Sequence, residues 1–361
     1  MIVSSDYSEL YERLYQSDGR EELAIYEELI RLADSNKDLP TAYDFRSAYC
    51  SRACEEGFPE KGIVAFSWCL AQYDKDPSLD DPYNLIWQYK VMLELIPIFE
   101  TVTRDQIIKM QEDMAKRLAW MGETERTAHY YRSWNLMRMG DYEKAAEFQE
   151  TYLGMTRTGM SDCDACERDR QVELLVRMHR DEEALQKGKT IMEGKMYCGE
   201  VPEFTNGHLV KALARLGKEE EATKRATKGY ELIRRERKYL GTIGDLMLIT
   251  VRNRDFNLGM RQVTKHLPWV VDSAAGELKY RFLNAVALFF EALSKDKPRT
   301  TKVRIPRELA CYRKGDSYDM GELAAWFAEE TRRYADRFNQ RNGNSRYDEM
   351  IRDNREIAAL D

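Results

Sequence analysis

Three cysteines make the one grouping in the sequence that is typical of metal binding. Cys163 and Cys166 are three residues apart at the expected start of a helix, so both thiols face one side, where the helix N-terminus favours the thiolate form. Cys198 lies about one repeat unit later, in an expected loop. Converging thiolates bind structural zinc or form a redox pair, whereas single small cysteines often just fill turns. We therefore expect either a zinc site, a redox pair or plain packing at these residues.

A zinc ion in a structural site usually has four protein ligands, so three thiolates require one more. The sequence offers Asp162, Glu203 and His208 nearby and favours none of them. The other four cysteines are scattered or lie in apolar helical runs, as reduced and buried thiols do. They are Cys50, Cys54, Cys69 and Cys311.

A second candidate site is a series of arginines, named here the arginine ladder. Its members are Arg138, Arg177, Arg215 and Arg252, at intervals of 39, 38 and 37 residues. Guanidinium groups at this regular spacing could form bidentate pairs with successive carboxylates of an extended partner segment. The alternative is that each arginine stabilises a helix end by binding its last carbonyl groups.

Three further side chains belong to the same predicted surface. Lys211 lies one helical turn before Arg215 and adds a point charge, while Trp134 and Asn135 precede Arg138 and would supply an apolar wall and an amide. Together with the ladder they predict a concave groove that binds an acidic segment or a C-terminal carboxylate.

The elements that position these residues are expected to be helices, because apolar residues recur at three-and-four spacing almost throughout. Short turns separate the segments, and a small residue follows each turn at a constant offset, which would let two helices of a hairpin cross closely. These residues are Ala24, Gly62, Ala145, Ala184, Ala222 and Gly259, at intervals of 38, 83, 39, 38 and 37. The interval of 83 contains one degenerate unit near residues 98–105. The period predicts about seven helix hairpins over residues 1–266.

The segments at 139–146 (MGDYEKAA) and 216–222 (LGKEEEA) resemble the tetratricopeptide repeat (TPR) family. The resemblance covers roughly residues 8–266 and is best at 130–230, although the intervals exceed the family's repeat of about 34 residues. It implies an all-α, right-handed superhelix, an α-solenoid, whose first helices line a concave face that binds protein or peptide segments.

Residues 267–361 are expected to form a C-terminal helical capping region. Residues 276–294 read as an apolar helix that closes the array, 295–319 as an extended basic connector, and 321–342 as another helix. The remaining residues are polar and are expected to fray. No β-sheet is expected anywhere.

Composition excludes several classes of protein. The 361 residues are 43% hydrophobic and 33% charged with a net charge of −7, which disfavours a general DNA binder. The longest apolar stretch, residues 285–290, is too short to span a membrane, and the N-terminus lacks the apolar run of a signal peptide, so a cytoplasmic location is expected.

No catalytic signature stands out, so we expect a non-enzymatic scaffold or adaptor for protein–protein interaction. One alternative is a peptide-sensing regulator. Another is an RNA-binding helical array that stacks bases on Tyr239, Trp269 and Tyr280. The acidic N-terminal region and the basic residues 206–240 also permit head-to-tail self-association.

Overall fold

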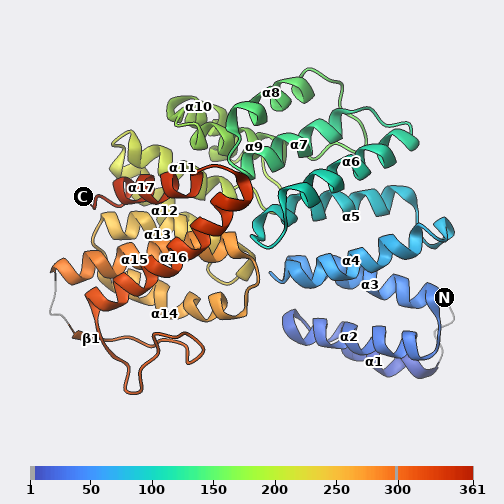
Figure 1. Cartoon of the computed structure of the whole chain (residues 1–361), viewed down its shortest axis with the longest axis horizontal. Helices are drawn as coiled ribbons and strands as arrows, with labels where there is room; N and C mark the ends of the chain where they lie inside the picture. The colour runs from blue at the N-terminus through green and yellow to red at the C-terminus, as the bar shows by residue number, and fades with distance from the viewer. Residues whose placement is uncertain (1–4, 297–299, 361) are drawn as a thin grey trace.

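The computed structural model describes residues 5–296 and 300–360. These residues form seventeen α-helices, three short 3₁₀ turns and one two-stranded sheet (Figure 1). The predicted all-α class is confirmed. No helix among the described residues combines the length and apolar character needed to cross a bilayer.

The first fourteen helices form seven consecutive pairs. The pairs are α1 (Ser5–Tyr15) with α2 (Gly19–Ser35), α3 (Leu39–Glu55) with α4 (Pro59–Tyr73), α5 (Pro82–Leu95) with α6 (Arg104–Trp120), α7 (Arg126–Arg138) with α8 (Tyr142–Leu153), α9 (Asp164–Arg177) with α10 (Asp181–Met192), α11 (Glu203–Arg215) with α12 (Glu219–Ile233), and α13 (Leu240–Arg252) with α14 (Phe256–Asp272). The degenerate unit is the α5–α6 hairpin, whose connection contains the 3₁₀ turn η2 (Ile96–Ile98). The seventh hairpin extends six residues past the expected boundary at 266.

Small residues do lie where the helices of a hairpin approach each other. A Cβ atom added to Gly62 of α4 would lie 2.9 Å from the carbonyl oxygen of Cys50 on α3. Ala145 of α8 is buried, and its carbonyl oxygen accepts a 2.7 Å hydrogen bond from the Ser133 hydroxyl of α7. The first hairpin departs from this pattern, because Ala24 is exposed.

The hairpins follow a curve that brings the last of them back to the first two (Figure 1). Arg20 at the start of α2 pairs with Asp272 at the end of α14. Arg237, in the 3₁₀ turn η3 (Arg237–Tyr239), also pairs with Asp272 at 3.1 Å and lies 4.8 Å from the ring centre of Phe58. The acidic N-terminal region and the basic region therefore meet within one chain.

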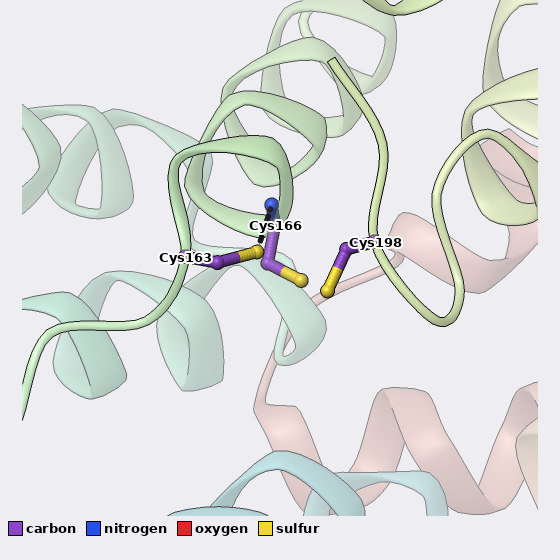
Figure 2. A group of neighbouring side chains, drawn as sticks. All are labelled: Cys163, Cys166 and Cys198. Atoms are coloured by element: carbon purple, nitrogen blue, oxygen red, sulfur yellow. Dashed lines mark hydrogen bonds between the residues drawn. The ribbon is translucent and has the colours of Figure 1, made fainter.

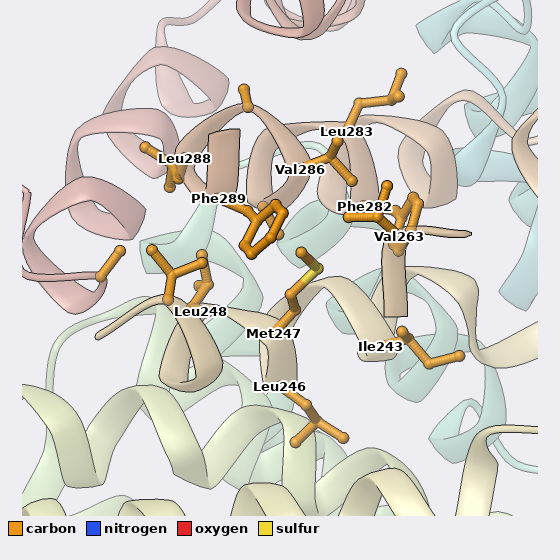
Figure 3. Close-up of a cluster of buried hydrophobic side chains, with 14 of the residues drawn as sticks. Ile243, Leu246, Met247, Leu248, Val263, Phe282, Leu283, Val286, Leu288 and Phe289 are labelled. Carbon is orange, nitrogen blue, oxygen red and sulfur yellow. The ribbon is translucent and has the colours of Figure 1, made fainter. Parts of the chain in front are cut away.

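Helix α15 (Gly276–Asp296) is the expected apolar helix, and it packs chiefly against α13 and α16 (Met320–Asn342). Its Phe282 and Phe289 are fully buried in the largest hydrophobic core, beside Met247 and Leu248 of α13 (Figure 3). The helix therefore covers the first helix of the last hairpin.

The connector contradicts the expectation of no β-structure. Strand β1 (Thr300–Lys302) pairs antiparallel with β2 (Ser317–Asp319). Tyr318 of β2 is buried and its hydroxyl accepts a 2.7 Å hydrogen bond from the backbone N–H of Arg313, which ties the connector to itself.

The expectation that the C-terminus frays is wrong. After Gly343, whose φ of 72° ends α16, residues Arg346–Ile357 form α17. This helix contacts α11, α13 and α15, and it buries Tyr347, Asn354 and Ile357.

The close approach of α3 and α4 gives a first test. Gly62→Ala should lower the free energy of unfolding by about 1–3 kcal/mol, because the added methyl group meets the backbone of α3. The matched control is Gly154→Ala, since Gly154 has φ of −76° and its added Cβ would meet no atom closer than 3.5 Å. Urea unfolding of both variants measures the difference, and equal stability would contradict the packing argument.

Candidate functional site

The arginine ladder occupies equivalent positions in four consecutive hairpins. Each of its members is the last residue of a first helix: α7, α9, α11 or α13. The structure brings the four residues to one side of the array, where their guanidinium groups meet carboxylates and carbonyl groups of the same chain.

Arg138 and Arg177 bind two buried glutamates. The carboxylate of Glu277, in the first turn of α15, accepts a 2.7 Å hydrogen bond from the Arg138 guanidinium group. It lies 3.5 Å from the guanidinium group of Arg177. Glu173 of α9 pairs with Arg177 at 2.7 Å and with Arg138 at 3.4 Å. Burial alone would raise the pKa of Glu173, but Arg138, His208 and Arg177 outweigh it and hold this pKa well below its usual value.

Arg215 and Arg252 bind α17. Arg215 forms a bidentate pair with Asp181 at 2.6 and 2.8 Å and also contacts both carboxylate oxygens of Asp353 in α17 at 3.0 Å. Arg252 donates to the carbonyl oxygen of Ile357, at the end of α17, at 2.9 Å. These two arginines therefore hold one carboxylate of α17 and the C-terminal end of that helix.

The ladder arginines do not bind the last carbonyl groups of their own helices. Arg215 instead donates to the Val176 carbonyl oxygen of α9 at 2.8 Å, and Arg252 donates to the Ile357 carbonyl oxygen at the end of α17. The arginines therefore bind carboxylates, and they also bind carbonyl groups at helix ends, but these helix ends belong to neighbouring helices. A cavity of about 90 Å³ remains between Arg177, Arg215 and the Met350 face of α17.

Lys211 is also engaged within the chain. Its ammonium group lies 2.8 Å from Asp245 of α13, which also pairs with Arg281 of α15. Burial opposes ionisation of Asp245, but Arg281 and Lys211 together lower its pKa to about 2.

A separate hollow of about 350 Å³ lies at the centre of the array, and only one ladder residue, Arg138, lines it. Most of its lining comes from α3, α5, α7, α9, α11 and α15, so that the first helices of five hairpins face it, and α4, η2, η3 and the loop before α11 add single residues. Apolar and charged side chains both contribute. The apolar ones include Trp87, Met92, Leu95, Phe204 and Leu278, and the charged ones include Glu94, Arg138, Arg170, Glu200 and Lys238.

Trp134 is largely buried and lines this hollow, whereas the predicted position was in a groove formed by the arginine ladder. Its indole N–H donates to the Glu94 carbonyl oxygen at 3.0 Å, and the guanidinium groups of Arg138 and Arg170 lie 4.3 and 3.7 Å from its ring centre. Asn135 does not share this position. It is fully buried one residue further round α7, so its amide is inaccessible to a partner.

Glu94 is an acidic residue of the hollow whose pKa is shifted by its surroundings. Burial raises its pKa to about 7, and the opposing effect of its partner Arg170 is smaller. Arg170 also lies beside Asp169 at 3.4 Å, so its charge stays balanced when Glu94 takes up a proton.

The three predicted cysteines do converge (Figure 2). The Sγ atoms of Cys163, Cys166 and Cys198 lie within 4.8 Å of one another. Cys163 is the N-cap of α9, and its sulfur accepts a 3.4 Å hydrogen bond from the backbone N–H of Cys166. Burial disfavours the Cys163 thiolate, yet hydrogen bonds from the Cys166 backbone and from Cys198 lower its pKa below the usual thiol value.

None of the three candidates for a fourth ligand joins this cluster in the described part of the chain. Asp162 pairs instead with Lys90 at 2.8 Å, and His208 is buried between Asp169 and Glu173 at 3.7 and 3.6 Å. Glu203 lies at the start of α11, where burial raises its pKa.

The aromatic residues named for base stacking are mostly inaccessible. Tyr239 and Tyr280 are buried, Tyr239 against Phe204 and Tyr280 against Tyr347, and Trp269 is half-buried beside His266. They therefore form no exposed platform for RNA.

Sequence reasoning missed the acidic partners of the ladder. Glu173 was detectable, because it lies four residues before Arg177 on the same helix. Asp353 was concealed by the polar character of its segment, although Tyr347, Met350 and Ile357 recur there at helical spacing. Glu277 carries no local signal that links it to Arg138.

Comparison of the chain with known protein families and with curated proteins gives no match.

The contact between the ladder and α17 leads to a stability prediction. Arg215→Gln should cost about 3 kcal/mol or more in the free energy of unfolding, because it leaves the buried Asp181 unpaired. Asp353→Asn should cost less, since Arg215 keeps Asp181. The control Arg13→Gln breaks only the exposed pair with Glu28 and should change stability by less than about 1 kcal/mol. Urea unfolding provides the measurement, and equal effects of Arg215→Gln and Arg13→Gln would contradict it.

Asp245 predicts a loss of stability in acid. Its folded pKa of about 2 lies below its ordinary value, so its stabilisation is complete above about pH 4 and disappears as the pH falls towards 2. The contribution is about 2 kcal/mol. Comparison of unfolding free energies at pH 4 and pH 2 should give a smaller decrease for Asp245→Asn than for the unchanged chain. A decrease of the same size in both would show that other carboxylates account for the acid sensitivity.

Proposed function

We propose that this chain is a TPR-like binding scaffold, a right-handed superhelix that holds a segment of a partner protein in its central hollow. The observation that carries the proposal is the lining of the hollow. The first helices of five hairpins converge on one space of about 350 Å³ that contains aromatic, aliphatic and charged side chains. Binding sites of this kind combine an apolar wall with a few polar groups that fix orientation.

The lining also indicates the chemistry of the partner. Trp87 is 41% exposed and presents an aromatic surface beside Met92 and Phe204, which suits an apolar or aromatic anchor residue. Arg170 suits a carboxylate, either of an acidic side chain or of a chain terminus. Because Glu94 has a pKa of about 7, it can be protonated near neutral pH, and an incoming carboxylate can then replace it as the partner of Arg170.

The peptide-sensing regulator is the second candidate, and the position of α17 favours it. The predicted ligand of the arginine ladder was an acidic or C-terminal segment, and α17 supplies such a segment from within the chain through Asp353 and the Ile357 carbonyl group. A partner segment of the same chemistry would compete with α17 for Arg215 and Arg252. In this form of the proposal, binding releases the C-terminal helix.

The scaffold proposal is tested by selecting ligands for the full chain from a random peptide library and measuring their affinity. Trp87→Ala should lower the affinity for the selected peptides by at least tenfold, because a buried aromatic contact contributes about 1.4 kcal/mol or more to binding. The control is Trp120→Ala, since Trp120 is 75% exposed and lies outside the hollow. Equal affinity of both variants for every selected peptide would place the binding site elsewhere.

The regulator is distinguished in the same experiment. Hydrogen exchange of residues 346–357 should become faster on peptide binding if α17 is released, and should stay unchanged if the chain is a simple scaffold.

A further inference from the structure

The cysteine cluster joins two segments that are distant in sequence. Cys163 and Cys166 belong to the start of α9, whereas Cys198 belongs to the loop of residues 193–202 between α10 and α11. The loop holds Cys198 in a tight turn, in which the Cys198 N–H donates to the Val201 carbonyl oxygen at 3.0 Å and the Val201 N–H donates back at 3.4 Å. Backbone hydrogen bonds thus position all three thiols, Cys163 and Cys166 through the helix cap and Cys198 through this turn.

The spacing of the sulfur atoms matches a single metal ion. Zn–S bonds of about 2.3 Å place tetrahedral sulfur ligands about 3.8 Å apart. Because the three Sγ atoms already lie within 4.8 Å of one another, they need to move closer by only about 1 Å or less. Cys163 and Cys198 are exposed and Cys166 is half-buried, so an ion can reach the cluster from solvent.

Metal binding would change the protonation of the cluster. A cation held between the three sulfurs would stabilise the thiolate form of all of them, and each thiol that becomes a ligand releases its proton to solvent.

We propose that Cys163, Cys166 and Cys198 bind one Zn²⁺ ion as three thiolate ligands, with the fourth position occupied by water or another exogenous ligand. Water or another exogenous ligand must occupy the fourth coordination position, because no histidine or carboxylate of the described chain joins the cluster. Three protein ligands with one open position are the arrangement of zinc sites that exchange a ligand, in contrast to closed structural sites with four.

The ion would also act on the hollow. Glu200 lies two residues after Cys198, Arg170 lies one helical turn after Cys166, and both line the hollow. Zinc therefore fixes the loop of residues 193–202 against α9 and so fixes part of the wall. The metal site itself does not depend on the proposed binding function, and its test uses the metal alone.

The test is a titration of the full chain, freed of metal with a chelator and kept reduced, with Zn²⁺ against a chromophoric competitor. We expect one equivalent to bind and to raise the melting temperature. Co²⁺ in place of Zn²⁺ should give thiolate charge-transfer absorption and the strong visible bands of tetrahedral coordination. Exchange of amide hydrogens in residues 193–202 should become slower with zinc.

Cys198→Ser should weaken zinc binding by at least a hundredfold and abolish the increase in melting temperature, because two thiolates remain. The matched control is Cys311→Ser, which replaces a half-buried free cysteine far from the cluster and should bind zinc as the unchanged chain does. Cys163→Ser provides a second ligand variant at an exposed site, should Cys198→Ser alter the loop. Absence of stoichiometric zinc, full affinity in both ligand variants, or stoichiometric Cu⁺ binding without zinc would each overturn the proposal.

Discussion

The position of α15 is constrained by one interaction, the pairing of the buried Glu277 with Arg138 and Arg177. A buried carboxylate without a cation would be strongly destabilising, so the first turn of α15 must lie within reach of these two guanidinium groups. The apolar residues of α15 complete the core with α13 and α16, and α16 leads into α17. The charge contact at α7 and α9 and this apolar core together position the C-terminal region.

The same contact connects the hollow with the arginine ladder. Arg138 lines the hollow, and its partner Glu277 is shared with Arg177, which lies beside α17. The members of the arginine ladder occupy equivalent positions in their hairpins, but their surroundings differ. The first member of the ladder lines the hollow, while Arg215 and Arg252 bind the chain's own C-terminal helix.

Local signals made most of the fold predictable, whereas long-range partners remained hidden. The hairpins follow from helical periodicity and from small residues such as Gly62, because close helix crossing demands them wherever a hairpin forms. The convergence of Cys198 with Cys163 and Cys166 followed from the repeat, which places equivalent loops side by side. By contrast, Asp353 meets Arg215 across 138 residues, and no local pattern encodes that pairing. The burial of Asn135 has a simpler cause. It follows Trp134 directly on α7, and one residue along a helix turns the side chain away from the hollow and into the interior.

The meeting of the first and last hairpins has a consequence for how such a chain can change length. In an open array each repeat contacts only its neighbours, so duplication or loss of a repeat alters the extent of the protein and little else. Here Asp272 must reach Arg20 and Arg237 must reach Phe58. Insertion or deletion of one hairpin would separate these groups. A change in the number of hairpins would therefore cost the chain the contacts between its first and last hairpins, which an open array does not have.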